Sequence, residues 1–221
     1  MKAKHEQLSN GVTKLIMSSL YWLFAFSYVF AAMFTNYPLD FMHKALPALL
    51  LAGWLHHLKL RHGYVAISAM LFCAAGDIFL KLPLAHGFVA GLSAFLIGHL
   101  LFACFFYQWA VWLPRKLIAL VALIAVMLGI GALILPQTGQ LLWPVSAYFL
   151  VITAMAITAI IATKKSLLLA GGALTFMLSD VMIGVNKFIM PVPFEHLLIM
   201  LSYYLALYLL AIGIKQRNKE T

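Results

Sequence analysis

The chain has 221 residues, of which 65% are hydrophobic and only 10% are charged, with a mean hydropathy of +1.01. A soluble domain carries roughly a quarter of charged residues, so this composition excludes a soluble domain and predicts an integral membrane protein. The formal net charge of +9 is spread over several short segments between apolar runs. This distribution indicates contact with anionic lipid headgroups and gives no reason to expect nucleic acid as a partner.

Eight apolar stretches follow one another along the chain, and each has the roughly 17 to 25 residues that a helix needs to cross a bilayer. They cover 15–35, 42–58, 63–82, 88–112, 116–135, 141–162, 166–186 and 194–214. The connections are short and hold Pro, Gly and charged residues, so any chemistry must lie among the helices or at their mouths. The sequence therefore predicts an all-α integral membrane protein, a bundle of eight transmembrane helices.

The predicted domain limits follow from these stretches. The bundle is expected to form one domain over 15–214, with tails over 1–14 and 215–221. The first apolar stretch is longer than the core of a secretory signal, and no clear cleavage site follows it, so we expect it to be retained.

The basic residues predict the orientation of the bundle. If the N-terminus is inside, the outer segments hold three of the 15 Lys and Arg residues, which are Lys44, Lys81 and Lys187. The inner segments hold the rest, which are Lys2, Lys4, Lys14, Lys59, Arg61, Arg115, Lys116, Lys164, Lys165, Lys215, Arg217 and Lys219. This bias predicts that both termini are cytoplasmic. Because outer-membrane proteins are barrels, transmembrane helices favour a multi-pass protein of the inner or plasma membrane.

Two of the six acidic residues lie well inside predicted helices, Asp77 in the third and Asp180 in the seventh. A carboxylate at membrane depth is costly, and intramembrane acids usually serve a function. Both lie a few residues before the outer ends of their helices, at depths that differ by only ~3 Å. We therefore expect Asp77 and Asp180 to be the catalytic residues, a coupled pair of carboxyl groups of which one is protonated.

Further polar residues converge on the same depth. Lys81 and Lys187 follow the two aspartates on the same helix faces, and Lys44 lies at the outer end of the second helix. A packing role is a competing interpretation for His99 and for the two tyrosines of the last helix. The predicted substrate-binding residues are Lys44, Lys81, His99, Ser179, Asn186, Lys187, Tyr203 and Tyr204. We expect neither a metal site nor a cofactor.

Several motifs in a fixed order resemble the YhhN-type lysoplasmalogenase family. They are "HKALP" at 43–47, "FCAAGDIFLKL" at 72–82, "GFVAGLSAFLIGHLLFACFF" at 87–106, "YFLVITAMA" at 148–156, "GGALTFMLSD" at 171–180 and "LSYYLALYLL" at 201–210. The resemblance spans nearly the whole chain.

The resemblance implies an eight-helix membrane enzyme and an activity. Members of this family cleave the vinyl ether bond of lysoplasmalogen, giving a fatty aldehyde and glycerophosphocholine or glycerophosphoethanolamine. The family motifs fall on Lys44, on Gly76 with Asp77, on His99 and on Ser179 with Asp180. A lysophospholipid substrate and membrane lipid are the implied partners. The choice of headgroup, the identity of the acid and the oligomeric state stay open.

The chemistry of the residues agrees with this resemblance. Hydrolysis of an enol ether begins with transfer of a proton to carbon and continues with the addition of water. A carboxylic acid can donate the proton, and a carboxylate can act as the base or stabilise the positive charge. Three other classes also fit parts of the sequence: a small transporter with an Asp proton or cation relay, a metal-dependent hydrolase of the ceramidase type, and a structural scaffold. The transporter predicts ion-dependent flux and no aldehyde. The metallohydrolase needs several intramembrane histidines, and the scaffold needs no buried acid.

Overall fold

The computed structural model describes residues 2–34, 37–162 and 167–218, without the side chains of 2–14. Every regular element within these ranges is helical, and eight α-helices follow one another in the chain. They are α1 (Lys2–Phe34), α2 (Asp40–His57), α3 (Gly63–Lys81), α4 (Gly87–Tyr107), α5 (Leu117–Ile134), α6 (Leu142–Ala162), α7 (Leu168–Phe188) and α8 (Glu195–Asn218). Short 3-10 helices flank α5, at Pro114–Lys116, Leu135–Gln137 and Gly139–Leu141.

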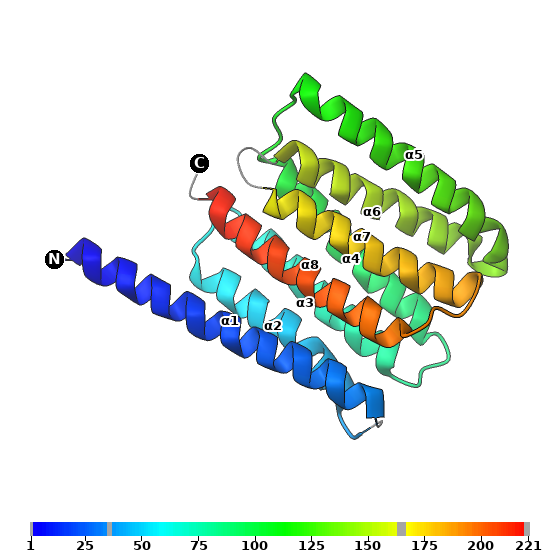
Figure 1. Ribbon diagram of the computed structural model, residues 1–221, viewed down its shortest axis with the longest axis horizontal. Coiled ribbons are helices and arrows are strands. Elements are labelled where there is room, and N and C mark those ends of the chain that lie inside the picture. Colours follow the sequence, from blue (N-terminus) through cyan, green and yellow to red (C-terminus); the bar gives the residue numbers. More distant parts are fainter. Residues whose placement is uncertain (1, 35–36, 163–166, 219–221) are drawn as a thin grey trace.

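The helices run up and down through the bundle, with α1 at one edge and α5 at the opposite edge (Figure 1). Helices α3, α4, α7 and α8 lie between these edges and pack in the pairs α3 with α4 and α7 with α8. Helix α1 begins and α8 ends at the same end of the bundle (Figure 1). We call that end the Arg217 end, and we call the opposite end, where α3 and α7 finish, the Lys44 end.

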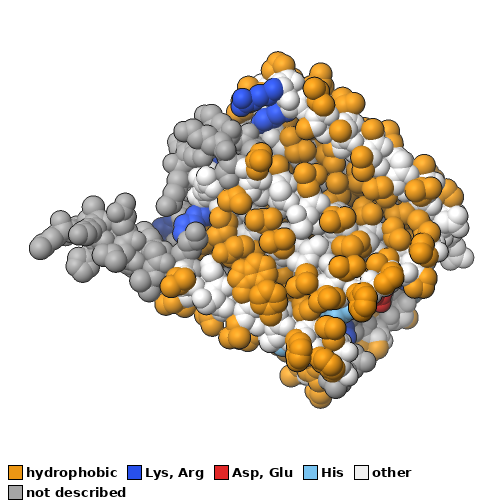
Figure 2. Space-filling model, viewed as in Figure 1, with side chains coloured by type: hydrophobic (Ala, Val, Ile, Leu, Met, Phe, Trp, Pro, Cys, Tyr) orange, Lys and Arg blue, Asp and Glu red, His pale blue; other side chains and the backbone are white. Residues whose placement is uncertain are grey.

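Seven of the helices are long and apolar enough to cross a membrane, and α2 is not among them. Helix α2 has 18 residues and includes Asp40, Lys44, His56 and His57, which lower its hydropathy. Orange apolar side chains spread over the visible face between the two ends, while blue Lys and Arg side chains gather at the ends of the helices (Figure 2). A multi-pass membrane protein accounts for this surface, because lipid tails solvate apolar side chains that water would not.

Glycines allow the central helices to approach closely. A Cβ added to Gly91 of α4 would lie 2.6 Å from Leu80 of α3, and one added to Gly213 of α8 would lie 2.9 Å from the backbone nitrogen of Leu169 on α7. Close approach through small residues is how membrane helices gain packing energy without a hydrophobic driving force between them. These contacts hold together the helices that carry Asp77 and Asp180.

The ends of several elements differ from the predicted limits. The backbone is helical from Lys2, so most of the predicted tail over 1–14 continues α1, and 215–218 likewise continue α8. Helix α4 ends at Tyr107 rather than at 112, five residues before the apolar run stops. Hydropathy alone cannot place these ends, because apolar residues also fill the connections and polar residues extend helices. Lys164, Lys165 and Lys219, which were counted for orientation, lie outside the described residues.

Candidate active site

Asp77 lies in α3 and is the buried partner of an ion pair. Its side chain is 1% exposed, and its Oδ1 lies 3.4 Å from the Nζ of Lys44 on α2. The hydroxyl of Tyr203 on α8 donates a hydrogen bond of 2.7 Å to the other carboxylate oxygen. The hydroxyl of Tyr204 donates to the backbone carbonyl of Lys44 at 2.9 Å, so α8 positions both partners of the pair. A cation and a hydroxyl donor together stabilise the ionised form of Asp77.

Asp180 lies in α7 with different partners. The hydroxyl of Tyr148 on α6 donates a hydrogen bond of 2.6 Å to its Oδ2. The Nε2 of His99 on α4 lies 3.7 Å from the same oxygen, beyond hydrogen-bonding distance. His99 is fully buried, and neither ring nitrogen has a hydrogen-bond partner among the described residues. Asp180 therefore contacts an uncharged phenol and an imidazole, while Asp77 contacts an ammonium group.

Aromatic rings fill the space between the two aspartates. The ring of Phe176 lies 4.5 Å from that of His99 and 5.3 Å from that of Tyr203, measured between centroids. Phe95 stacks on His99 at 6.4 Å and meets Tyr203 edge-on at 5.8 Å. We call Phe95, His99, Phe176 and Tyr203 the aromatic wall. The two carboxyl groups are near enough to interact electrostatically, but each has its own set of polar partners.

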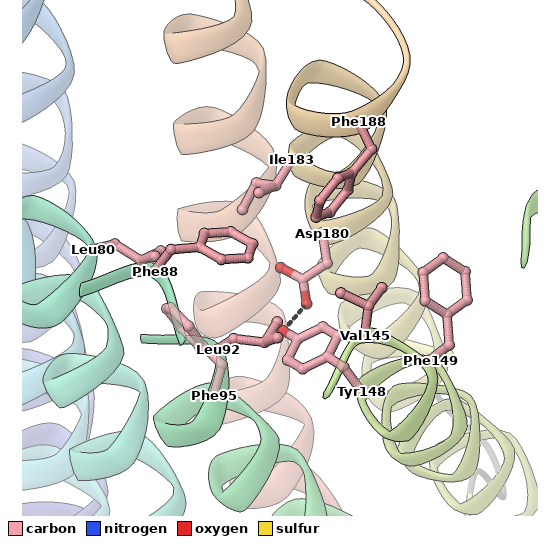
Figure 3. A pocket seen from close by; sticks show the side chains of 11 residues that line it. Leu80, Phe88, Leu92, Phe95, Val145, Tyr148, Phe149, Asp180, Ile183 and Phe188 are labelled. Atoms are coloured by element: carbon pink, nitrogen blue, oxygen red, sulfur yellow. Dashed lines mark hydrogen bonds between the residues drawn. The ribbon is translucent and has the colours of Figure 1, made fainter. Parts of the chain in front are cut away.

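A small cavity of about 40 Å³ adjoins Asp180 (Figure 3). Its lining is otherwise apolar or aromatic and comes from α3, α4, α6 and α7. The lining residues are Leu80, Phe88, Leu92, Phe95, Val145, Tyr148, Phe149, Asp180, Ile183, Gly184 and Phe188. The carboxylate of Asp180 points into this space, with Leu80 and Phe149 on opposite sides of it (Figure 3). Asp77 does not line this cavity, so Asp180 is the carboxyl group that a molecule bound there would meet.

The predicted substrate-binding lysines occupy different places at the Lys44 end. Lys81 forms an ion pair of 3.0 Å with Asp40 at the start of α2, whereas its register on α3 had predicted support for Asp77. Lys44, from the neighbouring helix, takes that place. Side chains four residues apart on one helix point in only roughly the same direction. A lysine on a neighbouring helix can instead point its ammonium group directly at the carboxylate. Lys187 lies 4.2 Å above the ring of Phe88, which lines the cavity.

Two predicted residues near Asp180 make structural contacts. The hydroxyl of Ser179 donates to the backbone carbonyl of Ile199 at 3.0 Å and so joins α7 to α8. The Oδ1 of Asn186 accepts a hydrogen bond of 2.9 Å from the backbone nitrogen of Val192, which fixes the connection between the same helices. Both residues position α7 rather than contact Asp180.

Sequence reasoning missed Tyr148. Its hydroxyl makes the shortest polar contact of Asp180, and it lies in the segment "YFLVITAMA" that resembles the family. A tyrosine within an otherwise apolar helix was the available signal, because a buried phenol hydroxyl needs a partner. That partner lies on another helix, so spacing along the chain gave no indication of it.

The described part of the chain offers no group of three His, Cys, Asp or Glu side chains close enough together to hold a metal ion. His99 and Asp180 lie 3.7 Å apart, and the hydroxyl of Tyr148 also contacts Asp180. The metal-dependent hydrolase that the sequence left open therefore has no ligand set among these residues.

Comparison with known proteins places the chain in a family. The model of the YhhN family matches residues 39–214. The chain belongs to the YhhN family. It is 33% identical over 174 residues to "Lysoplasmalogenase TMEM86B" of Homo sapiens, covering 77% of this chain and 73% of the relative. It is 34% identical over 186 residues to the protein of the same name from Sus scrofa, covering 80% and 75%.

A bacterial protein is also similar to the chain. The "Lysoplasmalogenase" of Mycobacterium tuberculosis is 34% identical over 130 residues, which cover 56% of this chain and 50% of the relative. No solved structure matches the chain. The family match covers both aspartates and runs from the start of α2 to residue 214 in α8.

The glycine that precedes Asp77 provides a test of the aromatic wall. A Cβ on Gly76 would lie 2.6 Å from the ring of Phe95, so Gly76→Ala must displace that ring. We expect a loss of stability of about 1 to 3 kcal/mol, measured by thermal unfolding of the purified protein, together with lower activity. Gly171→Ala is the matched control, because its Cβ would meet nothing within 4 Å. Equal unfolding temperatures for the two variants would contradict the tight contact at Gly76.

Proposed function

We propose that this protein is a lysoplasmalogenase, which hydrolyses the vinyl ether bond of lysoplasmalogen to a fatty aldehyde and glycerophosphocholine or glycerophosphoethanolamine. The observation that carries the proposal is the carboxyl group of Asp180, which faces an apolar cavity among membrane helices. Membership of the YhhN family and the names of the relatives support it. The bond to be cleaved is uncharged and joins an apolar chain to a polar headgroup, which suits such a cavity.

In the proposed mechanism Asp180 is the acid. The apolar and aromatic surroundings of Asp180 favour a neutral carboxyl group, whereas Lys44 favours the carboxylate of Asp77. Asp180 gives its proton to the vinyl carbon that is remote from the ether oxygen, and an oxocarbenium ion forms at the other carbon. The resulting carboxylate then takes a proton from the water that attacks this ion. The hemiacetal so formed collapses to the aldehyde and the free glycerol hydroxyl.

Asp77 has an electrostatic role in this proposal. It does not line the cavity, but its negative charge lies near enough to act on Asp180. A fixed negative charge stabilises the positive charge that develops in the transition state. Lys44 and Tyr203 hold that charge in place, so Asp77, Lys44 and Tyr203 act together as one electrostatic unit.

In this proposal the headgroup of the lysophospholipid binds at the Lys44 end. Lys81 and Lys187 belong to this end, and an ammonium group binds a phosphate by charge-assisted hydrogen bonds. The reactive ether then lies at the depth of Asp180, and the hydrocarbon chain extends away from the Lys44 end. The surrounding bilayer supplies the substrate directly.

Release of aldehyde tests the proposed function. Purified protein in lipid vesicles should produce fatty aldehyde from lysoplasmalogen and none from the matching lysophospholipid with an ester-linked chain. The absence of aldehyde, combined with ion flux into the same vesicles, would favour the transporter interpretation instead.

The origin of one hydrogen atom tests the proposed mechanism. If Asp180 protonates carbon, the proton comes from an exchangeable position, so aldehyde formed in heavy water should carry deuterium on the carbon next to the carbonyl. The aldehyde is reduced immediately after formation and examined by mass spectrometry, and unlabelled aldehyde held in heavy water for the same time is the control. Product without deuterium would exclude protonation at carbon.

An eight-span topology with both termini in the cytoplasm is part of the proposal. The basic residues of the Arg217 end, which include Arg61, Arg115 and Lys215, favour this orientation. Reporters inserted in the 59–62 connection or fused after Thr221 should give cytoplasmic signals, and one inserted near Gln137 should give an external signal. An external signal from the 59–62 connection would exclude α2 as a membrane span in this orientation.

A further inference from the structure

The cavity beside Asp180 is too small for the substrate. Its volume of about 40 Å³ accommodates a few water-sized groups, whereas a lysophospholipid brings a long hydrocarbon chain. A much larger space of about 580 Å³ lies between α5 and α6. We call it the α5–α6 groove; it runs from Ile124 to Pro136 along α5 and the 3-10 helix that follows it, and along α6 from Phe149 to Ile157. At 1.5 Å per residue, the α5 side is about 18 Å long.

One residue, Phe149, lines both the cavity of Asp180 and the α5–α6 groove. Phe149 follows Tyr148, whose hydroxyl donates a hydrogen bond to Asp180. The groove therefore begins at the residue next to the hydrogen-bond partner of the proposed acid. The other wall of the groove is close at this point, because a Cβ added to Gly131 of α5 would lie 3.9 Å from the ring of Phe149. The side chain of Phe149 therefore lies where the two spaces meet.

We infer that the α5–α6 groove binds the hydrocarbon chain of a single-chain ether phospholipid, with Phe149 between the chain and Asp180. The inference rests on the proposed function and adds the subsite that measures chain length. From Phe149 the groove follows α6 over eight residues to Ile157, a distance of about 12 Å. This direction leads away from the Lys44 end. A lipid with its headgroup at the Lys44 end and its ether at Asp180 directs its chain along this path.

The lining of the groove suits a hydrocarbon chain and no polar ligand. Its residues are apolar apart from Thr153, whose hydroxyl donates to the backbone carbonyl of Phe149 at 2.6 Å. A second apolar space, of about 350 Å³, lies among α1, α2 and α3 and includes Ile78 next to Asp77. It shares no lining residue with the cavity of Asp180, so a chain placed there would not connect with the acid. This second space is the alternative that the experiments must separate.

Substrates of two chain lengths test the inference in the full-length protein. The ratio of kcat/KM for an octadecenyl lysoplasmalogen to that for a decenyl one, with the same headgroup, reports binding of the distal part of the chain. Ile157→Trp fills the far end of the groove and should lower this ratio about tenfold or more, since a pocket rejects excess methylenes by such factors. Val126→Trp is the matched control, because Val126 is 55% exposed on α5 and does not line the groove.

The kcat/KM ratios of the two variants can contradict the inference in two ways. A ratio that stays constant in Ile157→Trp, or that falls equally in Val126→Trp, would overturn the inference. If Ile157→Trp does not fold, Leu128→Trp replaces it, because Leu128 lines the opposite wall and is 70% exposed. The same fall in ratio is expected for that variant.

Photolabelling separates this inference from the proposed activity, because it needs no turnover. The probe is a lysophospholipid with a stable saturated ether chain and a diazirine at the chain end, added to the protein in vesicles. We expect label within 124–128 and 153–157, displaced by excess unlabelled lysophospholipid and not by excess diacyl phospholipid. Label near Leu46 and Leu49 of α2, or label that diacyl phospholipid displaces equally well, would contradict binding of the chain in the groove. This conclusion would hold even if lysoplasmalogen is hydrolysed.

Discussion

Asp180→Asn should lower kcat for lysoplasmalogen at least ~100-fold, because removal of a general acid costs roughly 10² to 10⁴ in rate. An amide cannot supply the proton that the vinyl carbon needs, yet it has the size of the carboxyl group and still accepts the hydrogen bond from Tyr148. The folded state should therefore persist, with KM little changed. Steady-state kinetics, size-exclusion chromatography and circular dichroism measure these three properties.

Two control variants accompany the Asp180 experiment. Glu195→Gln removes an exposed carboxyl group at the start of α8 and should leave kcat within about twofold, as expected of a surface substitution. Tyr148→Phe removes the donor to Asp180 and should lower activity less than Asp180→Asn does, because the proton itself remains. Near-normal turnover in Asp180→Asn would remove this carboxyl group from the mechanism.

Lys44→Met should destabilise the folded protein by about 3 to 5 kcal/mol, the usual cost of leaving a buried charge without its partner. The carboxylate of Asp77 is 1% exposed and would keep only the hydroxyl of Tyr203. The double variant Lys44→Met/Asp77→Asn removes both charges and should recover most of that stability. Its activity should stay at least ~10-fold below wild type, because the fixed negative charge is missing.

The double variant separates packing from electrostatics at Asp77. Thermal unfolding in detergent gives the stability, and aldehyde release gives the activity. Arg61→Met, at the exposed surface of the Arg217 end, is the control for loss of a single cation and should change neither. If the double variant regains full activity together with its stability, Asp77 has a structural role only.

The sequence indicated the candidate site without its contacts. Charged residues inside apolar stretches are few, so Asp77 and Asp180 were recognisable, and Lys44, His99, Tyr203 and Tyr204 were predicted to lie at the same depth. The structure brings Lys44 and Tyr203 to Asp77, and His99 to Asp180. It also assigns Lys81 to Asp40 and adds Tyr148. These contacts join different helices, and hydropathy carries no information about how helices rotate against one another.

The sequence by itself determined that the protein lies in a membrane, that it is helical, and which two carboxyl groups lie inside its apolar stretches, because the cost of polar groups in hydrocarbon restricts the composition of each span. The tertiary structure decided which carboxyl group receives a cation, which one faces a cavity, and where that cavity meets a larger apolar groove. The physical reason is packing. Glycines such as Gly76 and Gly91 set how closely α3 and α4 approach, and the aromatic side chains then fill the space between the aspartates and leave the remainder open beside Asp180.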